Sequence, residues 1–279
     1  MAFREVDLKD VAENFDAFLI DQFGVLLNGP EIYPGAPEAL ARLAELGKPI
    51  LLLSNSGKRS APNEHRLAQR GFARDAFLGV LSSGEAAHFA LQETVGNTLP
   101  HGARVFLIAR DEDRSAIDGL DLSLTDQMDE ADLLLIAGSE AEQYKLEHYE
   151  ALLKIAAERC VPCWCTNPDK TMLTKTGPMY GAGRIAMLYE ELGGQVEWFG
   201  KPHPPIYQIA LKKLGNPMPS KVLCIGDSPE HDIRGGQDAG CATALVRTGI
   251  HEGETIAGLE AICARHKARP DFLLSRFAY

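Results

Sequence analysis

Four short apolar segments of the sequence are each followed directly by side chains that could carry out chemistry. Two of the segments lead into carboxylates, one leads into a hydroxyl and an amide, and one leads into a lysine. In chain order the side chains are Asp21 after Phe18–Ile20, Ser54 and Asn55 after Leu51–Leu53, Lys201 after Phe199–Gly200, and Asp227 and Asp232 after Cys224–Gly226. Open α/β sheets bind ligands at the carboxyl ends of their strands, so a site is expected at these positions.

The combination of these side chains suits phosphoryl transfer. A carboxylate can act as a nucleophile and form an aspartyl phosphate, and acidic oxygens are ligands that Mg²⁺ prefers. A hydroxyl and an ammonium group can stabilise the phosphoryl oxygens. A single Asp at a strand end is more often a turn or cap residue, so the prediction rests on the whole set.

Alternating apolar and amphipathic segments predict the elements that must hold these side chains. Strands are predicted over residues 15–21, 49–54, 104–109, 132–137, 161–166, 196–200, 222–227 and 243–246. The clearest helices are predicted over residues 37–46, 85–93, 142–158, 183–192 and 205–214. Repeated strand–helix units, with several strands apolar throughout, are typical of an α/β protein with a mostly parallel sheet.

The composition is that of a folded, acidic protein. The chain has 279 residues, of which 45% are hydrophobic and 24% are charged, and this excludes a largely disordered protein. A formal net charge of −11 without a basic patch argues against binding to nucleic acid or an anionic membrane surface. No apolar run approaches the roughly 18 residues of a membrane span, and no signal peptide is recognisable. We therefore expect a cytoplasmic protein whose six cysteines are reduced.

Two stretches of polar and small residues, 82–85 and 167–183, are the candidates for domain boundaries. If they are hinges, residues 84–197 form an inserted domain. Residues 1–83 plus 198–279 then close into one domain around it. A chain of 279 residues is long enough for two domains.

The order and spacing of the motifs resemble the haloacid dehalogenase-like hydrolase superfamily. Within it, the sequence is similar to the class IIA phosphatases with a C2-type cap, which include NagD-like and 4-nitrophenyl phosphatases. Further matching segments are Tyr33–Ala36, Ser83–Ala86, Thr166–Asp169 and Tyr207. The resemblance implies a doubly wound, Rossmann-like core with an inserted, smaller α/β cap domain. It also implies a Mg²⁺ cofactor and a small phosphorylated metabolite as substrate, and it is compatible with a homodimer formed through the cap.

The resemblance also implies roles for individual residues. Asp21 would be the nucleophile, Ser54 and Asn55 would bind the phosphoryl group, and Lys201 would neutralise its charge. The metal ligands would be Asp21, the Phe23 carbonyl, Asp227 and Asp232.

Phe23 departs from the pattern of the family. Phosphatases of the superfamily carry a second Asp at this position, two residues after the nucleophile, which protonates the leaving alcohol. A phenyl ring cannot transfer a proton, so general acid–base help worth about 10²–10⁴-fold is lost or comes from another residue, for which His203 is a candidate.

Three functional hypotheses follow from this departure. The first is a phosphatase with weak activity, and the second is a non-catalytic sensor of a phosphorylated ligand. The third is a 2-haloacid dehalogenase, because those enzymes carry a tyrosine at the position of Phe23. The third hypothesis is disfavoured because dehalogenases need no metal, whereas the sequence retains Asp227 and Asp232.

Overall fold

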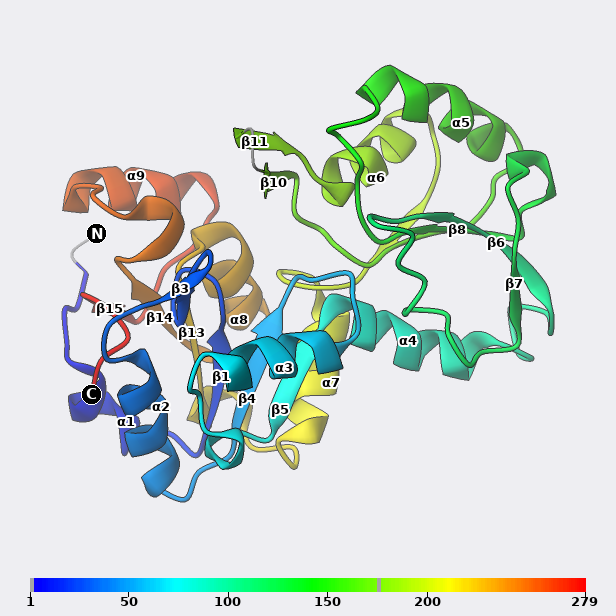
Figure 1. Cartoon of the computed structure of the whole chain (residues 1–279). Helices are drawn as coiled ribbons and strands as arrows, with labels where there is room; N and C mark the ends of the chain where they lie inside the picture. Colours follow the sequence, from blue (N-terminus) through cyan, green and yellow to red (C-terminus); the bar gives the residue numbers. More distant parts are fainter. Residues whose placement is uncertain (1–2, 175–176) are drawn as a thin grey trace. The chain divides into compact units, whose positions relative to one another are not determined.

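The computed structural model describes residues 3–174 and 177–279, which form two compact units. The first unit comprises Met1–Ser54, Ser60–Leu81 and Lys201–Tyr279. The second unit comprises Asn55–Arg59 and Ser82–Gly200. Each unit is built around its own parallel sheet (Figure 1).

The six-stranded sheet of the first unit has the order β15-β14-β13-β1-β4-β5. Its strands are β1 (Ala17–Asp21), β4 (Ile50–Ser54), β5 (Gly79–Ser82), β13 (Val222–Gly226), β14 (Ala242–Val246) and β15 (Phe272–Leu274). The chain proceeds outward from β1 through β4 to β5, and in the opposite direction from β13 through β14 to β15. The strand order therefore reverses between β1 and β13, and such a switch point is where doubly wound sheets bind ligands.

Helices cover both faces of this sheet. They are α1 (Leu8–Ala12), α2 (Ala36–Glu45), α3 (Ser60–Gln69), α7 (Pro204–Lys213), α8 (Arg234–Asp238) and α9 (Ile256–Arg265). Short helical turns lie at Arg74–Ala76, Pro219–Lys221, Pro229–Ile233 and Gly249–His251. Successive residues of β14 join different hydrophobic clusters: Ala244 and Val246 pack with α1 and α2, whereas Leu245 packs with α9. This alternation is the side-chain period of a strand that is buried on both faces.

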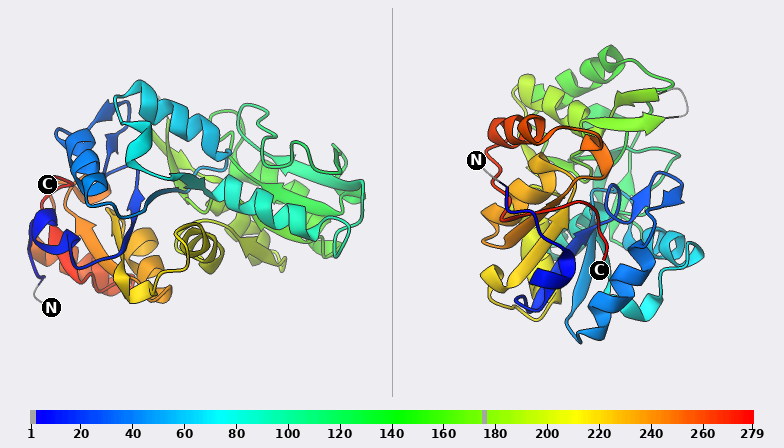
Figure 2. Two further views of the ribbon diagram at one scale, coloured as in Figure 1. Left: turned by 90° about the horizontal axis from the view of Figure 1, so that it is seen from below. Right: turned by 90° about the vertical axis from the view of Figure 1, so that its left-hand side faces the viewer.

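The N-terminal segment lies along the edge of the sheet formed by β15, as Figure 2 shows. Glu5 forms a bridge with Leu273, and the Val6 amide donates to the Leu273 carbonyl at 3.1 Å. A small antiparallel pair, β2 (Leu27–Asn28) and β3 (Glu31–Ile32), follows β1. These short elements keep the chain close to the sheet on either side of β1.

The second unit has a five-stranded parallel sheet with the order β12-β9-β8-β6-β7. Its strands are β6 (Ala103–Ile108), β7 (Leu122–Leu124), β8 (Leu133–Ile136), β9 (Cys163–Cys165) and β12 (Val196–Trp198). Its helices are α4 (Ser83–Thr94), α5 (Leu146–Glu158) and α6 (Ala182–Glu191), with a helical turn at Met128–Glu130. Helices α5 and α6 share one hydrophobic cluster with β6, β8 and β9, and α4 lies on the opposite face (Figure 1).

The two stretches expected to be hinges have regular structure. Ser82 ends β5, and its hydroxyl accepts a hydrogen bond at 3.1 Å from the Glu85 amide as the N-cap of α4. Residues 167–183 lie inside the second unit and include the antiparallel pair β10 (Thr171–Thr174) and β11 (Gly177–Tyr180). A polar segment containing Pro178 can therefore form a hairpin, and the inserted domain predicted over residues 84–197 stays a prediction.

The predicted fold class is confirmed: the protein is an α/β protein with a doubly wound parallel sheet and a second, smaller parallel sheet. Each of the eight predicted strands and five predicted helices is present, with ends that shift by a few residues. All six cysteines lie in the described part of the chain and have free thiols, as expected. Within the same residues no helix combines the length and the hydropathy that a membrane crossing requires.

Candidate active site

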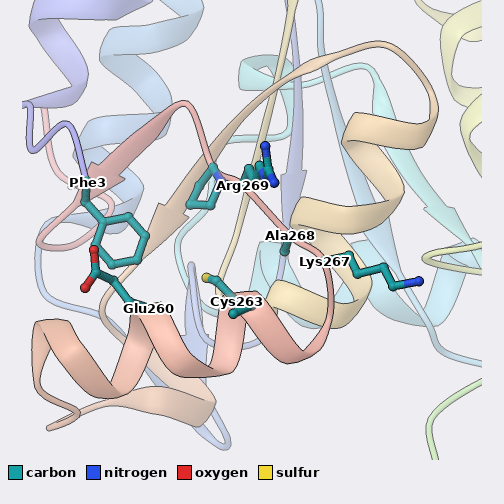
Figure 3. A pocket seen from close by; sticks show the side chains of 8 residues that line it. Phe3, Glu260, Cys263, Lys267, Ala268 and Arg269 are labelled. Carbon is teal, nitrogen blue, oxygen red and sulfur yellow. The ribbon is translucent and has the colours of Figure 1, made fainter. Parts of the chain in front are cut away.

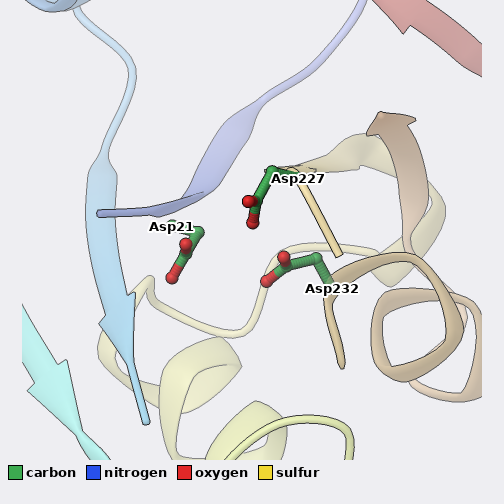
Figure 4. Close-up of side chains that lie close together, drawn as sticks. All are labelled: Asp21, Asp227 and Asp232. Atoms are coloured by element: carbon green, nitrogen blue, oxygen red, sulfur yellow. The ribbon is translucent and has the colours of Figure 1, made fainter. Parts of the chain in front are cut away.

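Three carboxylates converge at the carboxyl ends of β1 and β13. Asp21 ends β1, Asp227 follows β13 directly, and Asp232 lies in the helical turn Pro229–Ile233. Figure 4 shows their carboxylates pointing towards one another, and one oxygen of each lies within 4.8 Å of the others. All three residues are 9% exposed or less. The pairing of Ile20 with Ile225 in neighbouring parallel strands explains why these strand ends meet.

Lys201 completes this cluster. Its ammonium group donates hydrogen bonds to Asp21 Oδ1 and, at 2.6 Å, to Asp232 Oδ1. The side chain is buried, and burial alone would lower the pKa of Lys201. The two carboxylates outweigh burial and raise the pKa above its ordinary value, so the lysine stays charged.

The ionised forms of the clustered carboxylates are destabilised by burial and by one another. Burial raises the pKa of Asp21 to about 7, against the lowering effect of Lys201 and with a further contribution from Asp232. Burial and the neighbouring charges of Asp21 and Asp232 also raise the pKa of Asp227 well above its ordinary value. Three ionised carboxylates and one ammonium would leave two uncompensated negative charges in a buried place. A divalent cation with a preference for oxygen would compensate them, so these residues fit Mg²⁺.

A turn after β14 holds Asp227 in place. The Ile250 amide donates to Asp227 Oδ2 at 2.8 Å, and the Thr248 hydroxyl donates to the Gly24 carbonyl at 2.6 Å. Gly24 has φ +86°, and a Cβ atom there would lie 2.0 Å from Asp227 Oδ2. A glycine is therefore required at position 24 for two reasons, its backbone conformation and its close approach to Asp227.

This turn was missed by the sequence analysis. Its contact with Asp227 is made by a backbone amide, which every residue except proline has, so the residue types do not indicate it. A usable signal did exist, because Thr248 and Gly249 follow the predicted strand at 243–246 just as the other candidate residues follow theirs. Tyr33 contributes as well: its hydroxyl accepts a hydrogen bond at 3.0 Å from the Gly249 amide.

The second strand-end motif is divided between the two units. Ser54 ends β4 as a buried residue of the first unit, where β4 pairs with β1 so that Leu53 lies beside Asp21. Asn55 belongs to the second unit, and its amide donates at 2.8 Å to Asp169 Oδ1. The structure thus brings Ser54 to the edge that carries Asp21, while the roles predicted for Ser54 and Asn55 in phosphate binding stay predictions.

The remaining candidates have distinct surroundings. Phe23 is 42% exposed, and the guanidinium carbon of Arg66 lies 5.5 Å from the centre of its ring. His203 is the N-cap residue of α7. A cavity of about 520 Å³ lies between Phe3 and the C-terminal end of α9 (Figure 3), and no residue of the acidic cluster lines it. The chemistry expected from the sequence therefore belongs to the acidic cluster and not to this cavity.

The fold and the cluster define a doubly wound α/β protein with a carboxylate–lysine site at its switch point. Two family models match the chain, a haloacid dehalogenase-like hydrolase model over residues 18–123 and a HAD-hydrolase-like model over residues 198–278, and together they cover more than half of it. The chain is a member of the haloacid dehalogenase-like hydrolase superfamily, as its motifs predict.

Individual relatives agree with this assignment. Chronophin of Mus musculus is 29% identical over 88% of this chain and 86% of its own length. Among solved structures, a haloacid dehalogenase-like hydrolase from Brucella suis 1330 has 28% identity and a TM-score of 0.81, with 99% of each chain covered. The p-nitrophenyl phosphatase from Archaeoglobus fulgidus has 29% identity and a TM-score of 0.75, with 95% of this chain and 97% of its own covered.

Proposed function

We propose that the protein is a Mg²⁺-dependent phosphatase that hydrolyses a small phosphorylated metabolite through an aspartyl phosphate at Asp21. The observation that carries this proposal is the buried cluster in which Lys201 contacts Asp21 and Asp232 beside Asp227. The name of the Archaeoglobus fulgidus relative, a p-nitrophenyl phosphatase, supports the same reaction class.

The residues of the chain would divide the work as follows. A carboxylate oxygen of Asp21 attacks phosphorus, the ester P–O bond breaks, and the alcohol leaves with a proton taken from water. Water then attacks phosphorus, which releases inorganic phosphate and restores the Asp21 carboxylate. The buried ammonium of Lys201, with the Ser54 hydroxyl and the Asn55 amide, neutralises and orients the phosphoryl oxygens.

Asp21, the Phe23 carbonyl, Asp227 and Asp232 would hold the cation. When bound, Mg²⁺ supplies positive charge for the phosphoryl oxygens and for the clustered carboxylates. It would also favour the ionised form of Asp21, which is the form that can attack phosphorus. Lowering the pKa of Asp21 from about 7 is therefore part of activating this nucleophile.

A screen of phosphorylated metabolites and 4-nitrophenyl phosphate tests this proposal. Hydrolysis should require Mg²⁺ and should be lost in Asp21→Asn and in the presence of EDTA. Aryl and acyl phosphates should react faster than alkyl phosphates, because their leaving groups need no proton that Phe23 cannot deliver. Equal activity of the wild-type protein and Asp21→Asn would reject the proposal, since the activity would then come from a contaminant.

The presence of Phe23 supports one alternative function, a sensor of a phosphorylated ligand. A site that binds Mg²⁺ and phosphate but lacks a proton donor at this position would serve as a sensor of a phosphorylated ligand. Phe23→Asp separates the two functions, because it restores the type of side chain that transfers protons. A phosphatase should gain up to about 10²-fold in kcat on alkyl phosphates, whereas a folded variant that binds phosphate and hydrolyses nothing favours the sensor.

The cell compartment and assembly belong to the proposal too. Six free thiols, five of them buried, fit a reducing compartment such as the cytoplasm. A homodimer formed through residues 84–197, acting as the cap domain, stays a prediction that sedimentation of the whole protein tests.

A further inference from the structure

Arg66 lies over the ring of Phe23, the residue at which the sequence departs from the family pattern. The guanidinium carbon of Arg66, on α3, is 5.5 Å from the centre of the Phe23 ring. Both residues belong to the first unit, and Phe23 lies only two residues after Asp21. Phe23 is 42% exposed, so the surroundings of this pair are open to a ligand.

The charge of Arg66 is not compensated within the described part of the chain. No carboxylate there forms an ion pair with Arg66. The Arg66 Nη1 donates one long hydrogen bond, at 3.4 Å, to Asn63 Oδ1. The next cation along the chain, Arg70, follows the end of α3 and donates to the Pro30 and Arg66 carbonyls at 3.0 and 3.3 Å. Partial burial, together with the charge of Arg70, lowers the pKa of Arg66. An uncompensated, partly desolvated cation is unexpected in a chain with 28 basic and 39 acidic residues.

The contact with Phe23 leaves the hydrogen-bonding edge of the guanidinium available. The face of a phenyl ring attracts a cation but offers no lone pair, so the N–H donors along this edge can still bind an acceptor. This edge matches a carboxylate or a phosphate, which can accept two parallel hydrogen bonds. An aspartate at position 23, by contrast, would pair with Arg66 and cancel its charge. The phenylalanine therefore both removes a proton donor and keeps a cation free for a ligand.

We propose that Arg66 binds a second anionic group on the leaving part of the substrate. The substrate class is then a phosphate ester that carries a carboxylate or a second phosphate, and Arg66 determines the preference for it. This inference rests on the proposed function, in which Asp21 receives the phosphoryl group.

Three esters with the same three-carbon chain test the proposal: n-propyl phosphate, 3-phosphonooxypropanoate and propane-1,3-diyl bisphosphate. For the two esters that carry a second anionic group, the wild-type protein should show a kcat/KM about 10- to 100-fold above that for n-propyl phosphate. This factor is the usual contribution of a charge-assisted hydrogen bond. The ester with the larger ratio identifies which anion is preferred. Arg66→Gln should bring both ratios close to one and leave n-propyl phosphate hydrolysis nearly unchanged.

Two further variants separate recognition from a general loss of charge. Arg66→Lys keeps the charge but loses the planar fork, so it should show an intermediate ratio. Arg42→Gln is the matched control, because Arg42 lies on α2, where it pairs with Glu45 at 2.9 Å. The proposal would be overturned if the kcat/KM ratios drop equally in Arg42→Gln or stay unchanged in Arg66→Gln. It would also be overturned if the wild-type protein shows no preference among the three esters. If thermal melting shows that Arg66→Gln is unfolded, the result for Arg66→Lys decides.

A binding measurement keeps the inference separate from catalysis. Asp21→Asn, with Mg²⁺ present, should be stabilised more by 3-phosphonooxypropanoate than by n-propyl phosphate in thermal melts. Adding Arg66→Gln should remove that difference. If the difference is present but the wild-type protein hydrolyses no ester, the proposed phosphatase function fails and the role of Arg66 in binding stands. If the two esters stabilise equally, the role of Arg66 fails whatever the activity.

Discussion

The two units have sheets of the same kind but differ in what they bury at the ends of the strands. In the first unit the carboxyl ends of β1 and β13 hold buried charged groups, with Lys201 bridging two of the three aspartates. In the second unit the buried side chains that follow β8 and β9 are neutral, Ser139 and Thr166. Among the described residues, every buried Asp, Glu, Lys or Arg belongs to the first unit. A parallel sheet thus provides a location for a site, and the side-chain types there decide whether chemistry is possible.

The largest effect that this comparison predicts is on activity. Asp21→Asn should lower kcat by at least about 10³-fold, because an amide cannot form the phosphoryl intermediate. Asp132→Asn is the matched change in the second unit, where the carboxylate accepts a hydrogen bond from the Arg104 amide at 2.8 Å. Steady-state kinetics of both variants should show activity within about twofold of the wild-type protein for Asp132→Asn. A large loss in both would contradict the assignment of the chemistry to the first unit.

The next effect concerns the turn that supports Asp227. Thr248→Val removes the hydrogen bond from its hydroxyl to the Gly24 carbonyl and should raise the Mg²⁺ concentration for half-maximal thermal stabilisation by about 10-fold. Thr248→Ser keeps the hydroxyl and should restore most of the affinity. If Thr248→Val and Thr248→Ser respond to Mg²⁺ alike, the hydroxyl does not position the site.

The pH dependence of stability should also distinguish the two units. The pKa of Asp21 rises from 3.8 to about 7 on folding, so between these values the folded protein keeps a proton that the unfolded chain has lost. Without divalent cations, the free energy of unfolding should therefore fall as pH rises through this range, by up to about 4 kcal/mol.

Urea unfolding at pH 5 and pH 7.5, with EDTA or with Mg²⁺, measures this fall. Mg²⁺ should reduce it, because the cation favours the ionised carboxylates. In EDTA, the free energy of unfolding of Asp21→Asn should fall less between the two pH values than that of the wild-type protein. The free energy of unfolding of Asp132→Asn should fall as much as that of the wild-type protein. Identical pH dependence of stability in all three proteins would show that the pKa of Asp21 is not raised in the folded protein.

The smallest effects concern one buried, neutral side chain in each unit. The Gln22 amide and the Thr166 hydroxyl are fully buried and have no hydrogen-bond partner among the described residues. Gln22→Met and Thr166→Val remove these polar groups with little change in volume, and each should raise the free energy of unfolding by about 1 kcal/mol. A loss of stability in either variant, measured by urea unfolding, would indicate that a buried water satisfies the group in the native protein.

The positions of the main site residues were predictable because each follows an apolar strand. Asp21, Lys201, Asp227 and Asp232 were all selected in this way, and the structure brings them together. Ser82, in the stretch predicted as a hinge, is the N-cap residue of α4 and begins a segment of the second unit. A polar residue at a strand end can have both roles.

Other features were not predictable because they depend on contacts between distant residues. The contact of Arg66 with the Phe23 ring joins α3 to the segment that follows β1, and neither residue type indicates it. The hairpin at β10 and β11 was missed because Pro178 and the polar residues around it resemble a loop. Such segments gain their structure from pairing with each other and not from burial.

The bridge between Glu5 and Leu273 has a consequence for how the protein behaves in solution. An outer strand such as β15 offers unpaired backbone groups to any other extended chain, and exposed edges of this kind promote aggregation. The N-terminal segment occupies that position, and it does so with the charged side chain of Glu5 beside the strand. A protein shortened by its first seven residues should therefore fold but lose solubility. An affinity tag is better attached at the other end of the chain.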